Sequence, residues 1–233
     1  MNDLDSQSST LNSPRVAALL ARLFRESEAS DEKLRAMFSS VTPEERARRM
    51  ADPHADYRKF YSRAKELYLA VSPETARLLY MLARANGAKA VVEFGTSFGI
   101  STIHLAAAVT DNGTGHVVTT ELSTAKVKAA RSNLEQAGVD AVVTILAGDA
   151  LQTLAEVPGP IGLVLLDGWK DLCLPVLRLL EPRLAPGALV AGDDSSFPGM
   201  AGYLDYVRDP AHGYVSVSFP VEDGMEISCW TGG

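Results

Sequence analysis

The sequence predicts an α/β fold, in which a doubly wound, mostly parallel, seven-stranded sheet is covered by helices on both faces and preceded by an N-terminal helical cap. From residue 88 onward, short apolar runs alternate with amphipathic helical stretches, a pattern typical of parallel strands joined by helices. Residues 14–70 carry apolar residues mainly at helical spacing. These two patterns predict the sheet and the cap.

Composition limits the classes of function. The chain has 233 residues, 46% of them hydrophobic and 22% charged, which is typical of one globular domain. Its formal net charge of −7 argues against nucleic acid, because affinity for phosphates comes from Lys and Arg. There is no signal-peptide pattern and no apolar run near the ~18 residues of a membrane span. We therefore expect a cytoplasmic protein with a small-molecule partner, no membrane contact and two reduced cysteines.

The N-terminal elements follow from breaks in the helical pattern. Residues 1–13 are polar and predict a flexible tail. Residues 14–70 predict a helical cap or lid, with a helix start at Thr42 and Pro43 and a helix over 56–70. Ser72 is placed to cap the helix that follows and that ends at Gly87. Residues 71–233 predict the core, in one compact domain with the cap.

Apolar runs predict five strands at residues 90–95, 116–122, 141–149, 161–167 and 188–194, and runs at 213–219 and 225–230 complete the sheet. In such sheets ligands bind beyond the carboxyl ends of the strands. Those ends are acidic here: Glu93, Glu121, Asp149, Asp167, Asp193 and Asp194. A ligand site is therefore expected at this edge.

The first strand runs into the glycine turn VVEFGTSFGIS. Gly95 allows a ligand to approach the backbone, and Gly99 and Ser101 lie at a helix start whose free N–H groups attract anions. The spacing is not G-x-G-x-x-G, so the dinucleotide fingerprint is missing. Glu121 nevertheless stands 26 residues after Gly95, near where a ribose-binding acid is expected. This pattern favours a ribose over a pyrophosphate.

Three carboxylates meet at neighbouring strand ends. Asp167 ends one strand, and Asp193 and Asp194 end the strand expected beside it, so a strand spacing of about 4.8 Å brings them together. A divalent cation such as Mg²⁺ would offset their repulsion, although Ca²⁺ and Mn²⁺ also suit oxygen ligands. The structural alternative is that Asp193 and Asp194 only cap the next helix.

The motifs VVEFGTSFGIS, VVTTEL, LAGDA, LLDGWKD and AGDDSSFPG, in this order over roughly residues 70–233, resemble the class I S-adenosylmethionine-dependent O-methyltransferases of the catechol and caffeoyl-CoA type. The resemblance implies a Rossmann-like methyltransferase fold and S-adenosylmethionine as cofactor. It implies cofactor binding by Val71, Glu93, Gly95, Thr96, Ser97, Ser101, Glu121, Gly148, Asp149, Ala150 and Asp167.

The same resemblance implies that Asp167, Asp193 and Asp194 bind Mg²⁺, with Asp167 and Lys170 catalytic and Lys170 the general base. Trp169 and Pro198 would form the walls of the substrate pocket. The chain departs from the family at two positions, because Asp194 stands where asparagine is usual and Gly168 where the catechol enzymes have a histidine.

Together these observations predict metal-dependent O-methylation of one hydroxyl of a vicinal dihydroxy aromatic. One alternative is metal-independent methylation of an O, N or C acceptor. A second is a cofactor-binding domain without chemistry. A homodimer formed through the N-terminal helices is also expected.

Overall fold

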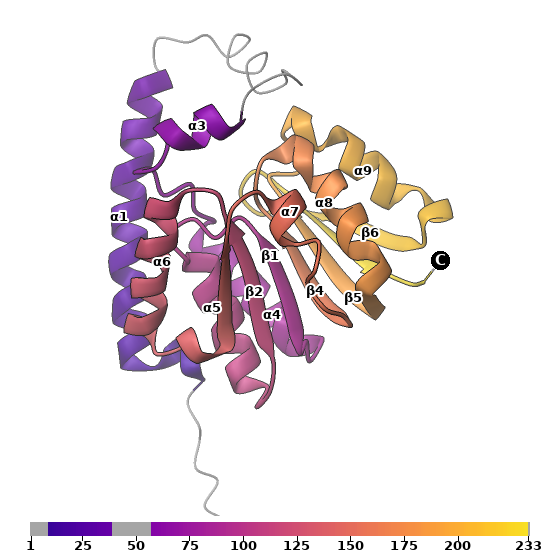
Figure 1. The fold of residues 1–233 in the computed structure, drawn as a ribbon, viewed down its shortest axis with the longest axis horizontal. Helices are drawn as coiled ribbons and strands as arrows, with labels where there is room; N and C mark the ends of the chain where they lie inside the picture. Colours follow the sequence, from indigo (N-terminus) through magenta and orange to yellow (C-terminus); the bar gives the residue numbers. More distant parts are fainter. Residues whose placement is uncertain (1–8, 39–56, 233) are drawn as a thin grey trace, which may run out of the picture.

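The computed structural model of this chain describes residues 9–38 and 57–232. Within them lie strands β1 (Ala90–Phe94), β2 (His116–Glu121), β3 (Val143–Ala147), β4 (Ile161–Leu166), β5 (Leu184–Asp193), β6 (Tyr214–Phe219) and β7 (Met225–Trp230). They form one sheet in the order β3-β2-β1-β4-β5-β7-β6 (Figure 1). The five strands β1 to β5 are parallel to one another, and β7 runs antiparallel to both β5 and β6. The predicted fold class is confirmed.

Helices cover both faces of this sheet (Figure 1). One face packs against α4 (Pro73–Ala85), α5 (Ile100–Asp111) and α6 (Thr124–Ala137), with α1 (Pro14–Phe38) outside them. The other face packs against α7 (Ala150–Thr153), α8 (Cys173–Leu180) and α9 (Ala201–Arg208). Side chains alternate along a strand, so Val91 joins the first core and Val92 the second.

Shorter helices connect these elements. The 3-10 helices are η1 (Thr10–Asn12), η2 (Asp140–Val142), η3 (Lys170–Leu172), η4 (Glu181–Arg183), η5 (Pro198–Met200) and η6 (Pro210–His212). Helix α3 (Tyr57–Arg63) lies over the edge where the parallel strands end (Figure 1). Its Tyr57 and Tyr61 line a pocket at that edge. No helix in the described ranges 9–38 and 57–232 is both long and apolar enough to cross a membrane.

Local sequence signals explain how the core begins. The Ser72 hydroxyl accepts a hydrogen bond from the Thr75 N–H at 3.1 Å, and Pro73 occupies the first turn of α4, so the predicted cap is confirmed. Strand β5 begins at Leu184, four residues before the predicted start at 188. Its pairing with β4 places Leu166 opposite Gly192. Asp167, the residue after β4, and Asp193, the last residue of β5, therefore lie at the ends of neighbouring strands.

The predicted helix over residues 56–70 is wrong in its second half, because α3 ends at Arg63. Tertiary contacts explain the early end: the Tyr68 N–H donates to Ser30 Oγ on α1 at 2.9 Å instead of to its own helix, and Leu69 has a left-handed φ of 44°. The helix start predicted at Thr42 and Pro43 lies outside the described residues.

Only part of the segment predicted to be a tail is described. Residues 10–12 form η1, and the Thr10 N–H donates to Asp111 Oδ1 at 2.9 Å. This contact joins the start of the described chain to the end of α5.

Candidate active site

Two adjoining pockets lie at the carboxyl ends of the parallel strands. They share Leu69, Gly95, Ser97 and Asp167 in their walls. The smaller pocket is also lined by Val71, Thr96 and Ser101. The larger one is lined by Glu121, Gly148, Asp149, Ala150 and Trp169, among others. The structure therefore brings eleven of the predicted site residues together around one crevice.

The glycine turn after β1 is stabilised by a hydrogen bond to the Glu121 carboxylate. Its Ser97 has a left-handed φ of 47°, which is uncommon for a residue with a side chain. Glu121 stabilises this turn, because one carboxylate oxygen accepts the Ser97 N–H at 2.9 Å and the other accepts the Ser123 N–H at 2.7 Å. The Glu121 carboxylate thus has a fixed orientation at the pocket wall.

Glu93 is fully buried behind the same turn. Its Oε2 accepts the Thr119 hydroxyl at 2.6 Å, whereas Oε1 has no hydrogen-bond partner among the described residues. Burial raises the pKa of Glu93 to about 7. A buried carboxyl oxygen without a donor is costly unless a ligand supplies one.

The Asp149 side chain joins two parts of the pocket. It caps α7 by accepting the Leu151 N–H at 3.1 Å. The Tyr57 hydroxyl and the Arg58 guanidinium of α3 also reach Asp149 Oδ2, at 2.6 Å and 2.7 Å. Helix α3 is therefore fastened to the strand-end side of the pocket.

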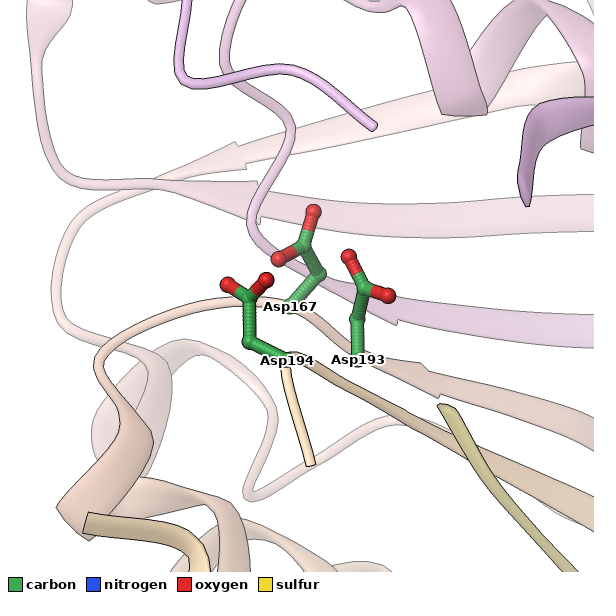
Figure 2. Close-up of side chains that lie close together, drawn as sticks. All are labelled: Asp167, Asp193 and Asp194. Carbon is green, nitrogen blue, oxygen red and sulfur yellow. The ribbon is translucent and has the colours of Figure 1, made fainter. Parts of the chain in front are cut away.

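The three aspartates predicted as metal ligands are together. Oxygens of Asp167, Asp193 and Asp194 all lie within 4.8 Å of one another, and their carboxyl groups converge beyond the ends of β4 and β5 (Figure 2). Burial and the neighbouring Asp167 raise the pKa of Asp193 to about 9. Burial raises the pKa of Asp167 to about 6, although Lys170 acts in the opposite direction.

Lys170 is the cation of this cluster. Its Nζ lies 3.0 Å from Asp167 Oδ1 and 2.8 Å from Asp194 Oδ2. Burial lowers the pKa of Lys170, but the two carboxylates outweigh burial and hold it well above its usual range. The amine is therefore protonated unless another cation takes up the carboxylate charge.

Comparisons with known proteins show that this chain is similar to methyltransferases. Residues 92–195 match the methyltransferase domain family. A catechol O-methyltransferase from Mycobacterium tuberculosis is 40% identical over 54% of this chain and 57% of its own length. Catechol O-methyltransferase B from Danio rerio is 28% identical over 74% of this chain and 69% of its own length. The chain thus spans less than two thirds of the mycobacterial relative.

A solved structure extends the likeness to the fold. The O-methyltransferase TomG from Streptomyces achromogenes, in complex with SAM, is 25% identical with a TM-score of 0.64, covering 89% of this chain and 99% of that one. These matches support a methyltransferase that resembles the class I S-adenosylmethionine-dependent O-methyltransferases, as the sequence predicts.

Trp169 of this methyltransferase faces the aromatic side of α3. Its ring centroid lies 6.4 Å from that of Tyr57, 5.6 Å from Phe60 and 6.3 Å from Tyr61. Pro198, the other predicted wall residue, is exposed and lines neither pocket. Its neighbour Gly199 lies against the Lys170 side chain.

Gly168 is explained by the ring of Phe94. A Cβ atom at Gly168 would lie 2.2 Å from Phe94 Cζ, and both residues line the larger pocket. The phenyl ring fills the space that a side chain at position 168 would need. A histidine at position 168, as the catechol enzymes have, would therefore clash with Phe94.

Gly168→Ala is expected to destabilise the methyltransferase by about 1–3 kcal/mol, because the added methyl overpacks the site against Phe94. Chemical denaturation measures this loss. Gly202→Ala in α9 is the matched control, since a Cβ there meets only Leu174 Cδ2, at 4.0 Å, and should be neutral or slightly stabilising. Equal stability of the two variants would show that the Phe94 ring moves aside freely.

Sequence reasoning missed several pocket residues. Tyr57, Tyr61, Phe94 and Lys126 line the larger pocket, but the α3 tyrosines reach it only through the tertiary placement of that helix. Lys126 did carry a signal: it lies on the buried stripe of α6, four residues before Ala130. A lysine on an apolar helix face is unusual.

Proposed function

We propose that this protein is a divalent-metal-dependent O-methyltransferase that uses S-adenosylmethionine to methylate one hydroxyl of a small vicinal dihydroxy aromatic. The observation that carries the proposal is the cluster of three aspartates and Lys170 at the edge of a crevice that also holds Glu121. The names of the two catechol O-methyltransferase relatives support the acceptor class.

The pocket residues fit S-adenosylmethionine, the ligand of the TomG structure. Glu121 offers carboxylate oxygens to paired ribose hydroxyls. Glu93 Oε1 lacks a donor, and the cofactor's amino group is a donor of that kind. Thr96, Ser97, Ser101 and Val71 would surround the methionine part. Gly148, Asp149 and Ala150 would lie along the adenine.

The aspartate cluster fits a hard divalent cation. Three carboxylates face one ammonium group, which leaves two negative charges without a partner when all three are ionised. Oxygen donors are the ligands that Mg²⁺ prefers. Asp194 would supply an oxygen where the family has asparagine, so the ligand set would keep its oxygen donors and gain one negative charge.

The cofactor, the cation and the protein's side chains would have separate roles in methyl transfer. S-adenosylmethionine supplies an electrophilic methyl group, and a divalent cation supplies charge that favours a deprotonated acceptor hydroxyl. Lys170 Nζ accepts the hydroxyl proton once the carboxylates no longer hold it protonated. Trp169, with Tyr57, Phe60 and Tyr61, orients a planar ring and excludes water.

One observation favours the metal-independent alternative as a second candidate. The Lys170 ammonium already bridges Asp167 and Asp194, so it supplies part of the positive charge that a metal would bring. In that case the aspartates position Lys170, and orientation of the acceptor carries catalysis. Dependence of turnover on a divalent cation separates the two candidates.

Glu121→Ala is expected to raise the dissociation constant of S-adenosylhomocysteine by about a hundredfold, because two hydrogen bonds to a charged group are lost. Titration calorimetry measures the change. Glu135→Ala, at an exposed position of α6, should bind like the wild type. Unchanged affinity of Glu121→Ala would remove Glu121 from the proposed cofactor site.

A further inference from the structure

Lys126 is a buried lysine of α6 with no part in the chemistry described above. Its side chain is 1% exposed and lines the larger pocket. Among the described residues it has no ion-pair partner within 4.0 Å; its amine donates to Ser97 Oγ at 3.1 Å and lies 5.6 Å from the Phe98 ring centroid. Fully buried lysines are rare unless paired. The position therefore needs a functional or structural reason.

Ser97 links Lys126 to the cofactor site. The Ser97 hydroxyl accepts from Lys126 and donates to the Tyr68 carbonyl, while the Ser97 N–H donates to Glu121 Oε2 at 2.9 Å. One residue in a strained left-handed conformation thus joins α6, the end of β2 and the segment before α4. Strain of this kind persists only where surrounding contacts fix it.

The segment held by Ser97 forms part of both pockets. Tyr68 precedes Leu69, which lines the two of them, and Val71, which lines the smaller one. The Tyr68 ring stacks on Phe98 with centroids 4.0 Å apart and planes 10° apart. Lys126, Phe98 and Tyr68 therefore form one packed column beside the glycine turn.

We propose that Lys126 is a positioning residue of the cofactor site, which fixes Ser97 and through it the Glu121 carboxylate and the segment from Tyr68 to Val71. The inference rests on the proposed function, because it assigns these groups to the cofactor. Burial lowers the pKa of Lys126 to about 8, with Glu121 and Asp167 acting in the opposite direction. A cation kept at this cost, without a carboxylate in contact, suits a role in binding more than one in stability.

The test is titration calorimetry of the full chain with S-adenosylhomocysteine. Lys126→Met keeps the apolar stem and removes the amine, and Ser97→Ala removes its acceptor. Each is expected to raise the dissociation constant about tenfold. The double variant should also lose about tenfold, because both changes break one linkage. Lys128→Met, exposed on the same helix, is the matched control and should bind like the wild type.

Kinetics separate positioning from a purely structural role. Lys126→Met should raise KM for S-adenosylmethionine about tenfold and leave kcat within about twofold. A lower melting temperature with an unchanged dissociation constant would overturn the inference, and so would losses that multiply to about a hundredfold in the double variant. If Lys126→Met does not fold, Lys126→Gln takes its place; failure of both to fold would assign Lys126 to the core and overturn the proposal. Wild-type protein that does not bind S-adenosylhomocysteine would instead contradict the proposed function.

Discussion

Replacing Asp167 by asparagine is expected to lower methyl transfer in the presence of Mg²⁺ by more than about a hundredfold. Losing even an outer partner of a metal ligand costs 10- to 100-fold, and Asp167 is proposed as a direct ligand as well as a partner of Lys170. The variant should fold as stably as the wild type, because it removes one of three clustered carboxylates that repel one another. Initial rates and thermal melts measure the two effects.

Two other substitutions serve as comparisons for Asp167→Asn. Asp171→Asn changes an exposed acid four residues away and should leave turnover unchanged. Asp194→Asn should keep turnover and weaken Mg²⁺ binding, since the amide still offers an oxygen but removes one charge. Full activity of Asp167→Asn would show that these aspartates do not serve the reaction.

Lys170→Met is expected to reduce kcat by about 10²–10⁴-fold, the usual effect of removing a general base. It should also destabilise the protein by about 3–5 kcal/mol without metal, because Asp167 and Asp194 lose their cation. Added Mg²⁺ should recover much of that stability, because it would supply positive charge to Asp167 and Asp194 in place of the Lys170 ammonium group. Single-turnover kinetics and melts with and without Mg²⁺ measure both parts.

The control for this variant is Lys128→Met, which removes an exposed lysine far from the aspartates in sequence and should change neither value. Retention of kcat in Lys170→Met would place the base elsewhere. A melting temperature that Mg²⁺ does not raise would argue that the cluster holds no cation.

Much of the fold was predictable, because burial on both faces leaves nearly uninterrupted apolar runs such as that of β4. The end of α3 was not, since Tyr68 leaves the helix to bond Ser30, a residue 38 positions away. Local propensity cannot report such a contact.

The residues of the site were also predictable only in part. Strand-end acids such as Asp167 and Asp193 were predictable, because parallel strands deliver their ends to one edge. The interlock of Phe94 with Gly168 and the approach of Tyr57 to Asp149 depend on side chains from separate elements. No local pattern specifies those pairs.

Metal dependence is measured by methyl transfer from labelled S-adenosylmethionine to a panel of catechols, run in parallel with Mg²⁺ and with EDTA. We predict turnover with Mg²⁺ that EDTA removes and that added Mg²⁺ restores. Turnover that survives EDTA would contradict metal-dependent methylation and would assign Asp167, Asp193 and Asp194 to positioning Lys170.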